Sequence, residues 1–104
     1  MRCSVVIVQE AEQQLRDIDA WWQEERASST ASFMDEFSQT VELLSEMPDI
    51  GPLFRRTMRK GVRRVYMTRS KHWLYYVHDA AHSLVFVLAV WSSFRGSNPV
   101  LPKV

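Results

Sequence analysis

Apolar and polar residues follow two different periods along this chain, one on each side of a basic segment. Through most of the first 50 residues, apolar residues recur every three or four positions, which is typical of amphipathic helices. From residue 62 onward the period falls to two, and valine and aromatic residues dominate, which is typical of strands. The pattern therefore predicts a largely helical half followed by a half that forms a sheet.

The first half is expected to hold one strand and two helices. Residues 4–8 (SVVIV) are apolar and β-branched, which favours a strand. The polar segment 10–27 predicts a helix, and its apolar face consists of Ala11, Leu15, Ile18 and Trp22. A second helix is expected over about residues 31–47, with the hydroxyl residues of ASST (27–30) as its cap.

The apolar face of the second helix is formed by Phe33, Phe37, Val41 and Leu44. The helix is expected to end at PDIGP, because proline and glycine disfavour its continuation. Two helices joined by four residues make an antiparallel hairpin.

The second half predicts three strands, over residues 62–67, 72–78 and 83–91, joined by turns short enough for hairpins. The last strand is almost entirely apolar, so we expect it to be central and covered on both faces. The tail 94–104 is expected to end the sheet and fray. The fold class is thus α+β, in the order β-α-α-β-β-β. A helical hairpin packs on a mostly antiparallel four-stranded sheet, in a single domain spanning residues 1–104.

Charge is distributed very unevenly. Residues 1–50 hold eleven carboxylates and three cations, whereas residues 51–104 hold ten cations and one carboxylate. The two halves therefore have net charges of −8 and +9, although the net charge of the whole chain is only +1. Six cations lie within residues 55–64: Arg55, Arg56, Arg59, Lys60, Arg63 and Arg64. Such asymmetry concerns partners and association rather than fold.

The basic segment has three interpretations. Its arginines can pair with the acidic helices, although surface ion pairs contribute only ~0–1 kcal/mol each. They can bind nucleic-acid phosphates, with Tyr66, Tyr76 or Trp91 available for stacking. They can also bind an acidic protein segment. Composition alone does not separate the last two.

Other chemistry-bearing residues give weaker signals. Cys3 has no second cysteine to pair with, which suits a reducing cytosol, and a structural thiol is favoured over a catalytic one. His78 and His82 are interpreted as ordinary hairpin residues rather than zinc ligands, and His72 is a possible general base. Of Tyr75 and Tyr76, one is expected inside and one outside with a free hydroxyl. We expect no metal or cofactor.

No stretch approaches the ~20 apolar residues of a membrane span, so we expect a cytoplasmic protein with no membrane partner.

Several segments in order, PDIGPLFR, GVRRVYM, YYVHD and VFVLAVWSSFRGSNP, resemble the ParE/RelE superfamily of toxins from type II toxin–antitoxin systems. The resemblance runs from about Val5 to Pro99. It implies a cognate antitoxin whose acidic C-terminal segment folds onto the toxin. It also implies a basic sheet surface, to which Arg63 or Arg64 and Arg95 correspond.

The two branches of this superfamily differ in target. RelE-like members are ribosome-dependent, metal-independent mRNA endoribonucleases that use a Tyr or His near the C-terminus as a proton donor, whereas ParE-like members bind and poison DNA gyrase. The tail after Trp91 has neither Tyr nor His, so the ParE-like branch is preferred and no catalytic residue is assigned. The alternatives are a RelE-like nuclease and an inactive member that only binds a partner. Expected contacts to target or antitoxin are Arg55, Arg56, Arg59, Lys60, Arg63, Arg64, Tyr76, Trp91 and Arg95.

Overall fold

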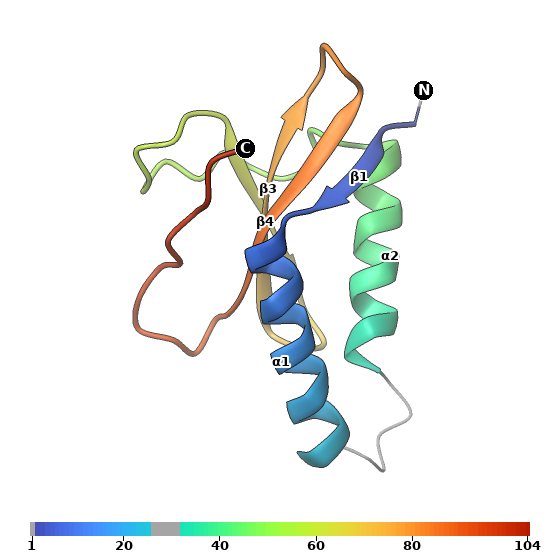
Figure 1. Cartoon of the computed structure of the whole chain (residues 1–104), viewed down its shortest axis with the longest axis vertical. Helices are drawn as coiled ribbons and strands as arrows, with labels where there is room; N and C mark the ends of the chain where they lie inside the picture. The colour runs from blue at the N-terminus through green and yellow to red at the C-terminus, as the bar shows by residue number, and fades with distance from the viewer. Residues whose placement is uncertain (1, 26–31) are drawn as a thin grey trace.

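The structure, a computed structural model, describes residues 2–25 and 32–104. Its elements are β1 (Ser4–Ile7), α1 (Gln9–Glu25), α2 (Phe33–Glu46), β2 (Val62–Met67), β3 (His72–Asp79) and β4 (Leu84–Ser92). The strands form one sheet in the order β1-β4-β3-β2, in which only the β1–β4 pair is parallel among the described strands. This confirms the predicted fold class. In Figure 1 the helices lie beside each other next to the sheet, and the C-terminal tail passes the strands on the side away from α2.

The start of α2 differs from the prediction by a few residues. Ser32 is the N-cap, and its side-chain oxygen accepts a hydrogen bond from the backbone N–H of Asp35 at 3.3 Å. This hydroxyl satisfies one of the donors that a helix leaves free in its first turn. The proposed cap in ASST, residues 27–30, lies outside the described residues.

The main core lies between the helices and one face of the sheet. Ala11, Leu15, Phe33, Phe37 and Leu44, all predicted on the apolar faces of the helices, are buried. They pack against sheet residues in one cluster, which Ile18, Trp22 and Val41 join from its partly buried edge. The predicted helical register is therefore confirmed.

Strand β4 is central and has protein on both faces, as its apolar sequence predicts. Val85, Val87 and Val90 face the helices, whereas Leu88 and Ala89 belong to a second cluster on the opposite face. The change of face is caused by a bulge, at which the pairing with β3 shifts by one residue. The backbone N–H of Val90, next to this bulge, donates to the Gln14 side chain of α1 at 2.8 Å.

The C-terminal tail does not fray, which contradicts the prediction. Pro99 is buried, and Leu101 packs against the second cluster on the face away from the helices. The carbonyl oxygen of Pro102 accepts a hydrogen bond from Arg59 at 3.1 Å, and that of Ser97 accepts one from the Trp91 indole at 2.8 Å. The tail therefore covers part of the sheet surface that was predicted to be exposed.

A buried carboxylate ties α2 to the turn between β2 and β3. Glu36 accepts hydrogen bonds from the backbone N–H groups of Arg69 at 2.8 Å and Ser70 at 2.9 Å. Burial alone would raise the pKa of Glu36, but hydrogen bonds from Ser70 and Arg69, together with the charge of Arg69, outweigh it, and the pKa is lowered.

This arrangement predicts a pH-dependent contribution to stability. Because the pKa of Glu36 is lower in the folded state than its ordinary value of 4.5, ionised Glu36 stabilises the fold at pH values above 4.5. This stabilisation is lost as the pH falls through the folded-state pKa. We expect Glu36→Gln to lower the free energy of unfolding by ~1.5–3 kcal/mol at pH 7. Urea unfolding at pH 7 and pH 3 should show the wild type and the variant converging at the acid end. A difference that stays constant with pH would contradict the role given to the charge.

Among the described residues, no helix has the length and apolar character needed to cross a membrane.

Candidate functional site

The outer face of the sheet, away from the helices, carries a basic groove of about 470 Å³. Three arginines line it, Arg55 and Arg56 from the segment before β2 and Arg64 from β2 itself. The other lining residues are Pro52, Leu53, Phe54, Trp73 and Asn98. We call this feature the basic groove. It brings together three of the six cations that the sequence concentrates between residues 55 and 64.

Arg64 is held by aromatic rings. Its guanidinium carbon lies 3.7 Å from the centre of the Trp73 ring and 4.9 Å from that of Phe54. One guanidinium nitrogen donates to the hydroxyl of Tyr75 at 3.2 Å. A cation stacked on aromatic faces is pre-organised, so it loses little conformational freedom when an anion binds.

One wall of the groove is an extended segment that runs along the free edge of β2. The backbone N–H of Phe54 donates to the carbonyl of Val62 at 2.7 Å, and that of Arg64 donates to the carbonyl of Pro52 at 3.2 Å. Leu53 and Arg63 form an isolated antiparallel bridge. These bonds cover an edge that would otherwise expose unpaired backbone groups, and they place the following Arg55 and Arg56 beside Arg64.

The other wall comes from the C-terminal tail, through Asn98. The tail begins with a stacked pair, in which the guanidinium carbon of Arg95 lies 4.0 Å from the centre of the Trp91 ring. Arg95 does not line the basic groove, and Trp91 supports the tail through its bond to Ser97. The structure therefore separates this predicted pair from the arginine cluster.

The remaining predicted cations lie elsewhere. Arg63 is on the opposite side of β2 from Arg64, where it donates to the carbonyl of Gly51 at 2.7 Å and lies 3.7 Å from the carboxylate of Asp49. Arg59 is engaged with the tail, and Lys60 is exposed at the turn before β2. Arg64 is therefore the one of these two neighbouring arginines that faces away from the helices.

The prediction that Tyr76 is available at the surface for stacking is wrong. Tyr75 and Tyr76 do point to opposite faces, but both are buried. Tyr76 packs in the core under the helices, and Tyr75 is covered on the outer face by the second cluster, which includes Leu101 of the tail. Tyr76 lies on the helix side, where its hydroxyl accepts a hydrogen bond from the backbone N–H of Gly51 at 2.9 Å. Burial raises the pKa of Tyr76. A partner at the surface does not reach it.

A second hollow, of about 580 Å³, lies where α1 meets the start of β3 and the end of β4. We call it the end hollow. Trp21 and Phe94 line it as exposed aromatic rings, and its cations are Arg69, Lys71 and Arg95. His72 also lines it, and burial lowers the pKa of this imidazole. Arg95 therefore belongs to this hollow.

Sequence reasoning missed Trp73 and Asn98. Trp73 is directly opposite Tyr66 in the β2–β3 pairing, and the two rings lie 4.7 Å apart. The period of two along β3 places Trp73 on the same face as Tyr75. The contact between Trp73 and Arg64 could therefore have been predicted from the register of the β2–β3 hairpin. Asn98 carried no such signal, because its position depends on the path of the tail.

The chemistry of the basic groove is that of anion binding. Arginine stays protonated at all ordinary pH values and supplies several N–H donors in a planar fork, which suits phosphates and carboxylates. Among the residues described, no group of three or more His, Cys, Asp or Glu side chains is arranged to hold a metal ion.

Comparison with solved structures finds the same fold in several toxins. A chain of the intact RelBE toxin–antitoxin complex from E. coli aligns with a TM-score of 0.62 and 16 % identity, over 89 % of this chain and 99 % of that chain. The RelBE2 toxin–antitoxin complex from Mycobacterium tuberculosis gives 0.60 and 21 %, over 88 % and 99 %. The isolated E. coli RelE toxin gives 0.59 and 18 %, over 90 % and 87 %. At these identities the likeness concerns the fold.

Sequence comparison is more specific about the family. No curated protein sequence matches the chain. The family model described as "ParE toxin of type II toxin-antitoxin system, parDE" matches residues 5–95, which includes all the helices and strands except the first residue of β1, and most of the basic groove. The chain therefore belongs to the ParE toxin family of type II toxin–antitoxin systems.

Proposed function

We propose that this toxin arrests growth by binding DNA gyrase through the basic groove, without catalysing a reaction of its own. The observation that carries the proposal is the composition of the groove. Its charged groups are three arginines, and its other lining side chains are apolar, aromatic or amide. A nuclease needs a base and an acid that exchange protons, and the groove lining includes none of the His, Asp, Glu, Lys, Tyr or Cys side chains that usually fill these roles.

The histidines of the chain do not supply the missing groups to the groove. His78 is bonded to Asp49 and His82 to Asp79, and neither histidine lines the groove. His72 lines the end hollow. The ParE family match favours the same branch as the absence of a Tyr or His after Trp91.

We further propose that a cognate antitoxin silences the toxin. Two of the similar solved structures are toxin–antitoxin complexes. An antitoxin segment rich in Asp and Glu complements the net charge of +9 carried by residues 51–104. Occupation of the basic groove by such carboxylates would exclude the target by direct competition.

A RelE-like ribosome-dependent nuclease is the second candidate, and the end hollow favours it. There His72 lies with Arg69, Lys71 and Arg95. Its Nδ1 is 2.8 Å from the carbonyl oxygen of Ser70, so Nδ1 carries the proton and Nε2 keeps a lone pair. With its pKa lowered by burial, this imidazole is neutral at pH 7 and able to accept a proton. The similar solved structures are RelE toxins, which is consistent with this candidate.

Expression of the toxin in cells that lack an antitoxin tests the two targets. If gyrase is the target, we expect induction of the DNA-damage response and filamentous cells, with messenger RNA lengths unchanged. Purified toxin should also inhibit supercoiling by gyrase. His72→Gln is the matched variant, because it removes the candidate base of the end hollow and leaves the basic groove unchanged. Cleaved messages without a DNA-damage response, abolished by His72→Gln, would overturn the gyrase proposal in favour of the nuclease.

A further inference from the structure

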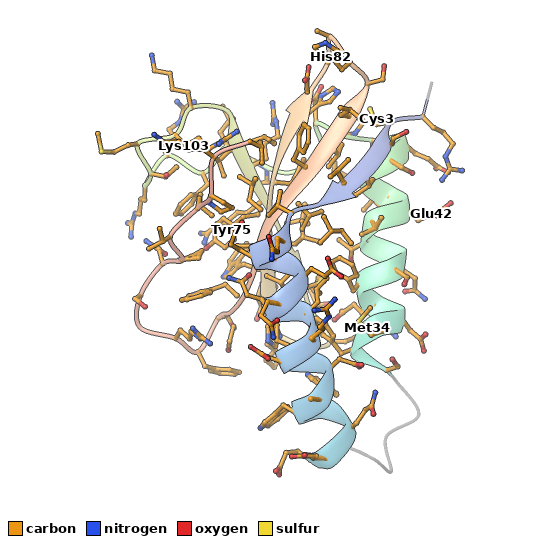
Figure 2. The ribbon with its side chains drawn as sticks, viewed as in Figure 1. Cys3, Met34, Glu42, Tyr75, His82 and Lys103 are labelled. Carbon is orange, nitrogen blue, oxygen red and sulfur yellow. The ribbon has the colours of Figure 1, made fainter. Side chains whose placement is uncertain are left out.

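Cys3, His78 and Asp49 come together from three separate parts of the chain. The Sγ of Cys3 lies 3.7 Å from Nε2 of His78, and Nδ1 of the same ring lies 2.8 Å from a carboxylate oxygen of Asp49. Cys3 precedes β1, Asp49 follows α2, and His78 is near the end of β3. Figure 2 shows Cys3 at the start of β1, next to the end of α2.

The carboxylate of Asp49 determines which nitrogen of the His78 ring carries the proton, and therefore whether the nitrogen that faces the Cys3 thiol has a free lone pair. Asp49 can only accept from Nδ1–H when it is ionised, so Nε2 of the neutral ring is the acceptor. That acceptor is directed at the Cys3 thiol. A nucleophile, a base and a group that orients the base are the three parts by which an activated thiol is recognised.

The charged surroundings hold this arrangement in place. Arg63 of β2 lies 3.7 Å from the same Asp49 oxygen, and it also donates to the Asp49 carbonyl at 3.2 Å. Arg2, next to Cys3, is engaged with Glu42 at 2.6 Å. The His78 side chain is 16 % exposed and Cys3 is half-buried, so the thiol remains within reach of a small molecule.

The backbone around Cys3 discriminates between two kinds of thiol chemistry. Acyl transfer needs N–H donors near the nucleophile to stabilise an oxyanion. The N–H of Cys3 is already bonded to the carbonyl of Ser45 at 2.8 Å, and that of Ser4 to the carbonyl of Ser83 at 3.0 Å. Attack on a disulfide develops charge on sulfur and needs no such donors.

We propose that Cys3 is a redox modification site, activated by His78 and Asp49, which takes a low-molecular-weight disulfide as its co-substrate. His78 Nε2 removes the thiol proton, and the Cys3 sulfur attacks one sulfur of the disulfide. The bond between the two disulfide sulfurs breaks as the bond to Cys3 forms. The other half leaves as a thiolate and takes the proton from His78. Cys3 is thereby oxidised to a mixed disulfide, and the leaving thiol is the reduced product.

The test uses the purified full-length chain and oxidised glutathione, with mixed-disulfide formation followed by intact mass between pH 6 and pH 9. A positioned base contributes ~10²–10⁴-fold to a proton transfer, so we expect His78→Gln to react at least ~10-fold more slowly at pH 7. The difference should narrow toward pH 9, because the higher concentration of hydroxide forms the thiolate without a positioned base. Asp49→Asn should give a smaller decrease.

The chain offers a matched control in a second His–Asp pair. His82 and Asp79 are 2.9 Å apart at the β3–β4 turn, whose tip Figure 2 marks by His82, and His82→Gln should react at the wild-type rate. Circular dichroism identifies any variant that fails to fold, in which case Asp49→Asn replaces it. Equal rates for wild type, His78→Gln and Asp49→Asn across the pH range would overturn the proposal. So would a native protein that reacts only after denaturation.

Discussion

Replacing Arg64 with alanine is expected to abolish the growth arrest that the toxin causes while leaving the chain folded. Arg64 is the one groove arginine that comes from the sheet, and its guanidinium is fixed over Trp73 at 3.7 Å. Removal of a rigid arginine anchor typically costs a protein interface ~2–4 kcal/mol. The lower value already corresponds to a ~30-fold loss of affinity for the target.

The neighbouring arginine provides the control. Arg63 has the same side chain, one position earlier on β2, but it lies on the other side of the strand against Asp49 and Gly51. We expect Arg63→Ala to remain toxic, with a modest loss of stability. Arg64→Lys should be intermediate, because lysine keeps the charge but lacks the planar group that stacks on tryptophan.

The measurement is cell growth after induction of each variant without antitoxin, beside urea unfolding of the purified proteins. If Arg64→Ala remains fully toxic, the basic groove does not contact the target, whatever the target is. If Arg63→Ala alone loses toxicity without loss of stability, the interface lies on the other side of β2.

The period of two in β2 was enough to place Arg63 and Arg64 on opposite faces. It did not tell which of them would face the helices, because that choice depends on contacts from distant segments. Asp49 and Gly51 receive Arg63, whereas Trp73 receives Arg64. Alternation is a local property of a strand, but the identity of each face is set by tertiary packing.

Tyr75 and Tyr76 show how an error in one segment spreads to another. Their alternation was predicted correctly, but Tyr76 is the one that faces the helices, and the outer tyrosine, Tyr75, is covered as well. The outer face was left open because the proline-rich tail was expected to fray. In the structure Pro99 is buried and Leu101 packs on the cluster that contains Tyr75. The two apolar residues between the prolines, Val100 and Leu101, were too weak a signal to predict this.

The cluster of Cys3, Asp49 and His78 lay beyond sequence reasoning altogether. Cys3 and His78 are 75 positions apart, and no fixed spacing in the sequence marks such a combination. Its members come together because β4 pairs with β1 on one side and with β3 on the other, so the start of β1 lies level with the end of β3. The parallel pairing that closes the fold thus creates a site that each residue, judged alone, did not suggest.

Replacing Phe37 with alanine is expected to lower the free energy of unfolding by ~3–5 kcal/mol. Phe37 is 3 % exposed, and its ring lies 6.4 Å from that of Phe33 within the main core. The substitution leaves a cavity between α2 and the sheet, since the surrounding rings relax only in part. Because a domain of this size is stable by ~5–15 kcal/mol, the loss is a large share of the total.

Ser38 is adjacent on the same helix but exposed, so Ser38→Ala should change the free energy of unfolding by less than ~0.5 kcal/mol. Phe37→Leu should cost less than alanine, because it fills more of the cavity. Urea unfolding at pH 7 measures all three variants, and an unchanged slope of free energy against urea shows that the comparison is valid. Equal midpoints for Phe37→Ala and Ser38→Ala would mean that α2 packs through a different face. The basic groove would then lose its support, since the sheet that carries Arg64 rests on this core.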